Sequence, residues 1–331
     1  MNTRPQSGVS RTERALRSHV KLRQLKLLVA LDEYRHLGQA AEALNITQPA
    51  VSKSLAEVET VFGAQLFTRS VRGTFPTPEG DLVIQLARLI LSELDRTVEE
   101  LAARAQGITG RVCIGAVGPG AHLLLARTVV ALKKRSAMTT VVVEEEPLEV
   151  LLQQLRVGKI DIVLSRIDPT LLDDDIEVRR LYDEPAVVIC GPGHPLTRLR
   201  HIEIGTLAQR PWVVPTRSGS MLAKLKEMFV VQGHEPPTDL TVGLSMLSAL
   251  LLVQERQAVC LLAQSVAEHL ERSGLVKILP VPFPLPLVPV GVLHRRTSQP
   301  SVALALLLEC VTQAAADIRR PLHADQGSMN A

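Results

Sequence analysis

The first predicted helices follow from the spacing of apolar residues in the N-terminal quarter of the chain. Apolar side chains recur at three- and four-residue intervals from Leu22 to Leu31, which predicts a helix that ends where the periodicity breaks, at residues 34–38. The Ala-rich run at residues 39–44 predicts a second, short helix that another helix can approach closely. We expect Gly38 to be its N-cap, without a side-chain acceptor, at a cost of roughly a few tenths of a kcal/mol relative to serine.

A third helix is predicted after a strong start signal. Thr47 stands in the N-cap position and Pro49 in the first turn, where the missing N–H of proline costs little. The apolar stripe of this helix leaves Gln48, Ser52 and Lys53 on another face. Two short helices joined by a tight turn form a helix-turn-helix, whose second helix enters the DNA major groove. A generic helical hairpin has similar spacing, so periodicity alone leaves both interpretations open.

The residues after the third helix predict a β-hairpin with a basic turn. Two short strand-like runs, residues 65–69 and 74–77, enclose a turn that contains Arg72 and a glycine. Beside a helix-turn-helix such a hairpin is a wing, in which we expect Arg69 and Arg72 to meet phosphate or the minor groove. Thr77 is expected both to contact phosphate and to cap the next helix.

A long amphipathic helix is predicted from Pro78 to Ala105. Leucine and valine side chains form one nearly continuous stripe along about seven turns, with charged residues opposite. Because a small winged domain cannot cover that stripe, we expect a partner helix from a second chain to cover it. Packing on the C-terminal part of the same chain is the alternative. Residues 107–110 then form a hinge.

The remainder of the chain alternates strand-like and helix-like segments, which is typical of α/β lobes. A βαβαβ series spans residues 112–164, and a second α/β series begins near Pro185. A strand at residues 288–294 and a helix at residues 302–318 are expected to return to the first lobe. The predicted divisions are a flexible basic extension (1–20), a winged helix-turn-helix (21–78), a linker helix and hinge (79–110), lobe I (111–184 and 288–318), lobe II (185–287) and a C-terminal tail (319–331).

Composition and charge narrow the function classes. With 331 residues, of which 46% are hydrophobic, the chain should fold into more than one domain. Residues 1–78 carry 11 Lys and Arg against 6 Asp and Glu, whereas residues 79–106 carry 3 against 6. A polyanionic partner would therefore meet the first block. Aromatic residues make up only 2%, which disfavours stacking on single-stranded nucleic acid.

Other chemistry finds little support in the sequence. The four cysteines lie far apart in apolar stretches, so buried thiols in a reducing cytosol are expected, with no metal and no cofactor. The N-terminal residues lack the apolar core of a signal peptide and no apolar run of about 18 residues occurs, so we expect a cytoplasmic protein that does not enter a membrane. Residues 115–120 read GxxGxG rather than GxGxxG, and no hydrolase or phosphate-loop motif occurs, so an enzyme is not expected. The alternative function is a stand-alone solute-binding or transport-associated module.

The run AAEALNITQPAVSKSLAEVETVFGAQLFTRSVRGTFPTPEG, residues 40–80, resembles the winged helix-turn-helix of the LysR-type transcriptional regulators. The resemblance implies a regulator, activator or repressor, that binds double-stranded promoter DNA. It also implies a homodimer through the linker helix and a tetramer built from dimers, with RNA polymerase as a further candidate partner. The DNA-contacting residues that it implies, together with those expected from the wing, are Arg23, Thr47, Gln48, Pro49, Ser52, Lys53, Arg69, Arg72 and Thr77.

The same resemblance extends into the C-terminal lobes. LLQQLRVGKIDIVLSR (151–166) and RLYDEPAVVICGPGHPL (180–196) look like the branch that includes the protocatechuate-responsive and galactose-binding-protein regulators. It implies two lobes like those of periplasmic binding proteins, with a small-molecule effector, a sugar or a hydroxylated aromatic or organic acid, in the cleft between them. A helix N-terminus there supplies free N–H groups for an anionic or polyhydroxylated ligand. The candidate effector contacts are Gly118, Pro119, Gly120, His122, Leu148, Arg166, Val214, Ser218 and Ser245.

Overall fold

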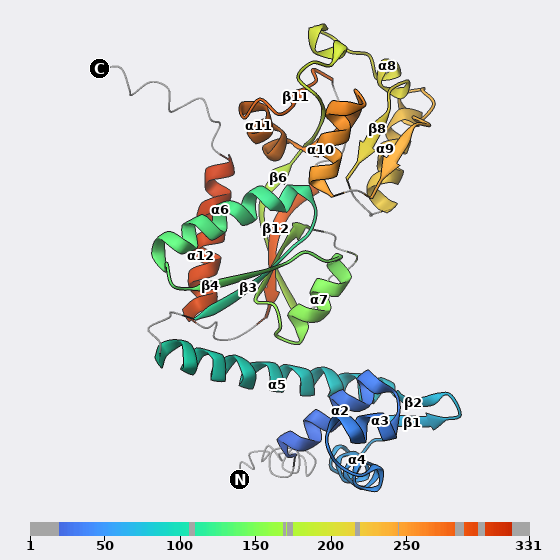
Figure 1. Ribbon diagram of the computed structural model, residues 1–331, viewed down its shortest axis with the longest axis vertical. Coiled ribbons are helices and arrows are strands. Elements are labelled where there is room, and N and C mark those ends of the chain that lie inside the picture. Colours follow the sequence, from blue (N-terminus) through green and yellow to red (C-terminus); the bar gives the residue numbers. More distant parts are fainter. Residues whose placement is uncertain are drawn as a thin grey trace, which may run out of the picture. The chain divides into compact units, whose positions relative to one another are not determined.

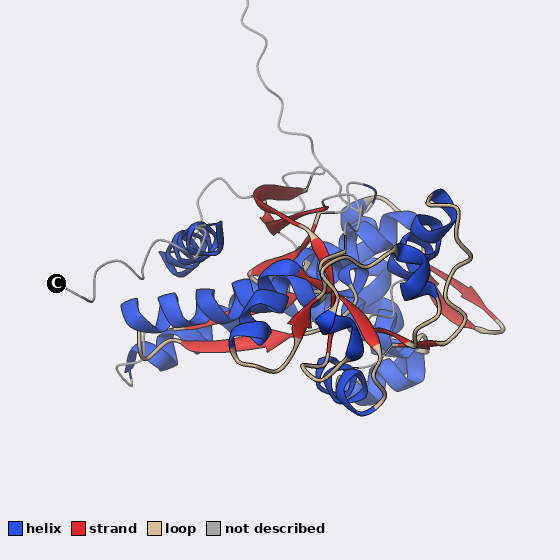
Figure 2. Cartoon of the chain, turned by 90° about the horizontal axis from the view of Figure 1, so that it is seen from above, coloured by secondary structure: helices blue, strands red, loops and turns tan. Residues whose placement is uncertain are grey.

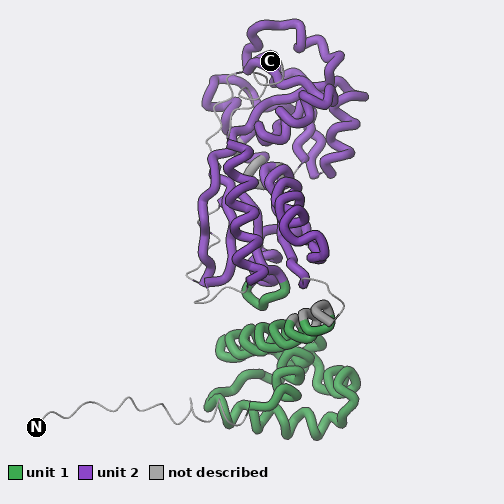
Figure 3. The backbone as a smooth tube through the Cα atoms, turned by 90° about the vertical axis from the view of Figure 1, so that its left-hand side faces the viewer, with its two compact units in different colours: residues 1–107, 156–159 green, residues 108–155, 160–331 purple. Residues whose placement is uncertain are grey.

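The computed structural model describes residues 20–105, 110–167, 170, 175–215, 219–243, 245–281, 288–296 and 302–319. Its backbone divides into two compact units, residues 1–107 with 156–159 and residues 108–155 with 160–331 (Figure 3). The predicted N-terminal extension, hinge and C-terminal tail lie almost entirely outside the described residues, as does Ser218. Each unit is considered by itself below.

The first unit is a winged helix-turn-helix followed by a long helix, as predicted (Figure 1). Strands β1 and β2 pair antiparallel in a two-stranded sheet, which is the wing. The elements are α2 (Leu22–Tyr34), α3 (Leu37–Ala43), α4 (Gln48–Phe62), β1 (Phe67–Ser70), β2 (Gly73–Pro76) and α5 (Pro78–Ala105).

Capping interactions explain where the helices of the first unit begin and end. The Thr47 side chain accepts a hydrogen bond from the backbone N–H of Ala50 at the start of α4, and Gly63, with φ 67°, ends that helix in the left-handed region. The prediction of Gly38 as the N-cap of α3 was wrong. The N-cap is His36, whose Nδ1 accepts the backbone N–H of Gly38 at 3.1 Å, so an imidazole nitrogen supplies the acceptor that glycine lacks.

The apolar residues of α5 lie on two faces, whereas the sequence predicted a single stripe that the winged domain does not cover. Ile84 and Ala87 are buried in the winged core, where they pack with residues of α2 and α4. Leu82 and Leu86 lie on another face and are exposed. The buried face continues at helical spacing beyond the winged domain, where Leu94, Val98 and Leu101 are exposed. The domain therefore covers the first half of one stripe and leaves the second half open.

The second unit begins with a mixed five-stranded sheet in the order β4-β3-β5-β12-β6. Strand β3 is parallel to β4 and β5, whereas β12 is antiparallel to β5 and β6. Helices α6 and α12 pack on one face of this sheet and α7 on the other (Figure 1). The elements are β3 (Arg111–Ala116), α6 (Pro119–Arg135), β4 (Thr140–Glu144), α7 (Leu148–Arg156), β5 (Ile162–Arg166), β6 (Ile176–Glu184), β12 (Val288–Arg295) and α12 (Val302–Arg319).

A second five-stranded sheet, in the order β11-β7-β10-β8-β9, lies between β6 and β12 in the sequence. Trp212 and Phe229 meet edge to face in the core beside this second sheet, with ring centroids 5.8 Å apart. Figure 2 shows the helices of both lobes in blue and their strands in red. The elements are β7 (Ala186–Cys190), η2 (Pro195–Arg198), α8 (Ile204–Ala208), β8 (Trp212–Val214), α9 (Gly219–Val231), β9 (Leu240–Val242), α10 (Met246–Glu255), β10 (Val259–Ala263), α11 (Gln264–Arg272) and β11 (Lys277–Ile278).

Five described elements of these lobes, β6, η2, α8, α11 and β11, have no counterpart among the predicted elements, and β6 and α11 are the longest of them. Strand β6 is an edge strand whose outward side chains are charged, so its residues lack a continuous apolar run. Helix α11 is short and mostly polar, with Ala267 as its buried residue. Among the described helices, none is both long and apolar enough to cross a membrane.

Candidate DNA-binding surface and effector site

The first turns of α4 and the strand β1 of the wing meet on one exposed surface of the first unit. Gln48, Pro49 and Lys53 are exposed at the start of α4, and Ser52 is half-buried beside them. Arg69 of β1 directs its Nη2 atom toward the Ser52 Oγ atom, 3.5 Å away. The predicted recognition helix and the predicted wing therefore present their polar side chains side by side.

The turn of the wing holds the second predicted arginine. Arg72 is exposed, and its backbone N–H donates to the hydroxyl of Ser70 at 3.1 Å, while that hydroxyl donates to the carbonyl of Gly73. These bonds fix the turn between the strands and leave the Arg72 side chain outside it. Arg23, in the first turn of α2, is also exposed.

Thr77 caps α5 as predicted, and its hydroxyl also donates to a backbone carbonyl. The hydroxyl accepts the backbone N–H of Gly80 at 3.0 Å and donates its own proton to the carbonyl of Gln65 at 2.7 Å. A phosphate oxygen needs a donor, and a threonine hydroxyl has one O–H. In this structure the carbonyl of Gln65 accepts that proton, and the phosphate contact of Thr77 stays a prediction.

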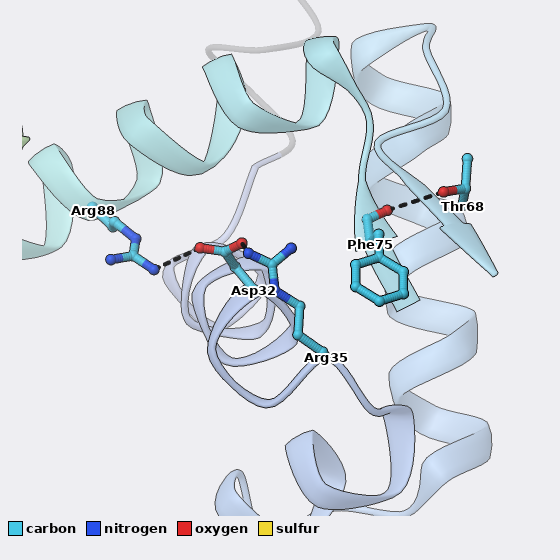
Figure 4. Close-up of polar contacts among 5 residues, drawn as sticks. All are labelled: Asp32, Arg35, Thr68, Phe75 and Arg88. Carbon is cyan, nitrogen blue, oxygen red and sulfur yellow. Dashed lines mark hydrogen bonds and ion pairs between the residues drawn. The ribbon is translucent and has the colours of Figure 1, made fainter. Parts of the chain in front are cut away.

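An ionic cluster behind the wing was not anticipated from the sequence. Asp32 of α2 pairs with Arg35 at the end of the same helix and with Arg88 of α5, and Arg35 lies over the ring of Phe75 in β2 (Figure 4). The i, i+3 spacing of Asp32 and Arg35 is a local signal for that pair, but neither hydrophobic periodicity nor a motif indicates the contact with Arg88, 56 residues from Asp32.

In the second unit, the N-terminus of α6 and the end of β5 lie together. Gly118, with φ 72°, is the N-cap of α6 and follows β3. A Cβ atom at Gly120 would lie 3.6 Å from the Nε atom of Arg166 and 3.6 Å from the Cγ atom of Glu184. The structure thus brings three predicted effector contacts, Gly118, Gly120 and Arg166, to one place.

Arg166 is also part of a buried polar network. Its Nη1 atom donates to the backbone carbonyl of Glu184 at 3.0 Å, and the Tyr182 hydroxyl donates to the carbonyl of Gly120 at 3.3 Å. Burial lowers the pKa of Arg166 from its ordinary value, and the charge of Glu184 opposes that shift. Burial raises the pKa of Glu184, against hydrogen bonds from Ser265 and the charge of Arg166.

The remaining predicted effector residues differ in what they can offer a ligand. His122 places Nε2 3.6 Å from a carboxylate oxygen of Glu145. The Ser245 hydroxyl caps α10 by accepting the backbone N–H of Ser248. The side chains of Leu148 and Val214 are packed in the apolar cores of their lobes, and their roles as effector contacts stay predictions. The side chain of Pro119 lies outside the described part of the chain.

Two family models match the chain over these two regions. Bacterial regulatory helix-turn-helix protein, lysR family, matches residues 22–81, and LysR substrate binding domain matches residues 105–316. The chain belongs to the LysR family of transcriptional regulators. This LysR regulator thus carries a DNA-binding domain in its first unit and an effector-binding domain in its second.

Individual relatives and solved structures agree with that membership. The chain is 31% identical to the HTH-type transcriptional regulator GbpR of Azospirillum brasilense, over 95% of this chain and 92% of that protein. Full-length CbnR complexed with its target DNA has a similar fold, with a TM-score of 0.59 at 22% identity, covering 89% of this chain and 100% of CbnR. LysG of Corynebacterium glutamicum, solved with bound effector Arg, gives a TM-score of 0.62 at 19% identity, over 91% of this LysR regulator and 100% of LysG.

Proposed function

We propose that this LysR regulator recognises promoter DNA with the first turns of α4 and contacts the flanking DNA phosphate backbone with its wing. The observation that carries the proposal is the contact of Arg69 with Ser52, which joins wing and helix into one polar surface. Gln48 fits an adenine edge in the major groove, and Lys53 fits a guanine edge or a phosphate. Arg69 and Arg72 supply phosphate or minor-groove contacts, and Arg23 a further backbone contact.

Binding to the promoter that flanks the protein's own gene, measured by gel shift and by anisotropy over a range of salt, tests this proposal. Lys53→Ala should weaken binding and lower the slope of log affinity against log salt by about one, if its partner is a phosphate. Arg69→Ala should weaken binding to promoter and unrelated DNA alike, whereas Ser52→Ala should act mainly on the promoter.

The matched control is Lys226→Ala, which removes an exposed lysine from α9 in the effector-binding unit. Its affinity and salt slope should equal those of the parent protein. Unchanged binding by both Lys53→Ala and Arg69→Ala would place the DNA interface elsewhere.

The proposed assembly is a homodimer through α5, and tetramers built from such dimers at the promoter. The exposed Leu94, Val98 and Leu101 support the dimer, because an apolar face of this length in water favours a partner helix.

We place the protein in the cytoplasm, where it would meet promoter DNA and RNA polymerase, and we assign it no catalytic activity.

We further propose that the effector binds where α6 begins, beside Arg166. The first N–H groups of α6 and the guanidinium of Arg166 both favour an anionic or polyhydroxylated ligand. A sugar and a hydroxylated aromatic acid both meet this requirement. The contacts proposed from lobe I are Gly118, Pro119, Gly120, His122 and Arg166, and those from lobe II are Ser218 and Ser245, with Leu148 and Val214 as apolar support behind them.

Thermal unfolding in the presence of small acids and sugars tests the effector site. A ligand at 100 times its Kd should stabilise the protein by about 2.7 kcal/mol. The shift should disappear in Arg166→Ala, whose DNA affinity without ligand should stay within a few-fold of the parent. A ligand that shifts Arg166→Ala as much as the parent would show that Arg166 is not a contact.

A further inference from the structure

The wing is held at its base by the end of α2. Arg35 ends α2 in the left-handed region, with φ 53°, and its backbone carbonyl accepts the N–H of Thr74 in β2 at 2.8 Å. A Cβ atom on Gly73 would lie 2.7 Å from that carbonyl oxygen, so a side chain at this position would force the wing away from α2. Thr74 itself is buried, which makes this the inner edge of the wing.

The side chain of Arg35 holds the same strand a second time (Figure 4). Its guanidinium carbon lies 5.9 Å from the ring centroid of Phe75, within the range of a cation–π interaction. Asp32 orients that guanidinium through a 2.7 Å contact with one carboxylate oxygen. The other oxygen of Asp32 accepts from Arg88 at 2.7 Å, which ties the arrangement to the linker helix α5.

These contacts lead directly to the DNA-contacting surface. Thr74 is the cross-strand partner of Arg69 in the register of the wing, and Arg69 reaches Ser52 of the recognition helix. A two-stranded hairpin of four residues per strand is too small to hold a fixed angle by itself. The angle of the wing, and with it the position of Arg69 and Arg72, depends on what anchors β2.

We infer that Arg35 is a positioning residue for DNA binding: it fixes the wing against the recognition helix, and Asp32 and Arg88 make that position continuous with the linker helix. This inference rests on the proposed role of the wing in DNA binding. Exposed ion pairs add little to stability, and the Arg35 side chain is 42% exposed, so loss of its charge should act on DNA binding more than on folding.

Arg35→Asn is the informative variant, because asparagine accepts the left-handed conformation but cannot reach Asp32 and Phe75 together. We expect its salt slope for promoter binding to fall by between about one and two, because a displaced wing no longer brings Arg69 and Arg72 to their phosphates. Hydroxyl-radical footprints should lose protection at the wing and keep it at the recognition helix. Arg35→Lys should restore most of the affinity.

A double-mutant cycle separates positioning from a general structural effect. Arg69→Ala should weaken binding much less in the Arg35→Asn background than in the parent, because both changes remove the same interaction with DNA. The control Arg256→Asn removes another exposed arginine–aspartate pair, in the second unit, and should bind DNA as the parent does. Asp32→Asn, which removes the charge with little change of shape, provides a second variant if Arg35→Asn does not fold.

Two results are distinguishable. In the first, Arg69→Ala weakens binding, but Arg35→Asn and Asp32→Asn keep the parent affinity and slope, or the effects of Arg35→Asn and Arg69→Ala simply add. The positioning role is then overturned and the proposed function stands. If Arg69→Ala itself leaves binding unchanged, the role of the wing in DNA binding fails, and the inference fails with it.

Discussion

At the scale of single residues, the cysteines show how burial decides chemistry. Burial raises the pKa of Cys113 to about 11 and the pKa of Cys190 and Cys260 to about 12, and it also raises that of Cys310. An ordinary free thiol has a pKa of about 8.5, and it is the thiolate that reacts. All four cysteines are buried, as their apolar sequence context predicts.

We therefore expect none of the four thiols to react rapidly with a disulfide reagent at pH 8 while the protein is folded. All four should react after denaturation, which can be followed by absorbance. Because no thiolate is available, treatment with hydrogen peroxide should leave promoter affinity unchanged. One rapidly reacting thiol in the folded protein would contradict this expectation.

At the scale of elements, α5 shows how a single helix serves two purposes. Its buried face begins in the winged core with Ile84 and Ala87 and continues to the exposed Leu94, Val98 and Leu101. Leu82 and Leu86 add a second exposed patch on another face. The helix therefore anchors the DNA-binding domain with one part, and the rest exposes the apolar surface to which we assign the proposed dimer contact.

Aspartate at Leu86 and at the neighbouring half-buried Leu89 of α5 should split the proposed dimer, because each unpaired charge in an apolar interface must be desolvated on association. Static light scattering should then report the monomer mass, with helical content preserved. Leu94→Asp with Val98→Asp makes the same test on the other patch, and Val231→Asp, at an exposed position on α9, is the control. If both double variants keep the parent mass, dimerisation does not use α5.

At the scale of the whole effector-binding unit, a buried carboxylate connects the two lobes. Glu184 ends β6 in the first sheet, and its carboxylate accepts both the backbone N–H and the hydroxyl of Ser265, at 3.0 and 2.8 Å, in the first turn of α11. The residue is 2% exposed. Helix α11 also contacts α6, so the helix at the proposed effector site and the second lobe meet beside this carboxylate.

Loss of one of these hydrogen bonds should be costly. Ser265→Ala removes a donor from a buried carboxylate and should destabilise the protein by about 1–3 kcal/mol, measured by urea unfolding. Thr197→Ala, which removes a hydroxyl bonded to the carbonyl of His194 in the same lobe, is a control that leaves Glu184 untouched. Equal losses of unfolding free energy in the two variants would show that the hydrogen bond to the buried Glu184 contributes no more than an ordinary one.

The raised pKa of Glu184 also predicts a pH dependence. A carboxyl group whose folded pKa exceeds its unfolded value binds protons more tightly in the folded state, so its contribution favours folding at low pH and is lost as pH rises through the folded pKa. The stability of the parent relative to Glu184→Gln should therefore increase as pH falls from 7 toward the ordinary carboxyl range. Thermal melts at matched ionic strength measure this difference, and an opposite slope would contradict the assigned direction.

The sequence by itself determined most of the elements and the fold class of this protein. Start signals such as Thr47 with Pro49, the helical period of α5 and the alternation of strands and helices are local, because each reflects backbone hydrogen bonding and the burial of one face. The winged helix-turn-helix and the two α/β lobes followed from these patterns and from the family resemblance, and the structure confirms them. The proposed DNA contacts stay predictions.

What only the tertiary structure decided are the contacts between residues far apart in the chain. The pairing of Asp32 with Arg88 and the bond of Glu184 to Ser265 depend on the packing of separate elements, whereas the i, i+3 pair of Asp32 with Arg35 is local to the end of α2. The edge strand β6 escaped prediction because its outward residues are charged. Packing likewise brings the hydroxyl of Thr77 to the carbonyl of Gln65, twelve residues earlier, a contact that the helix-cap signal alone does not predict.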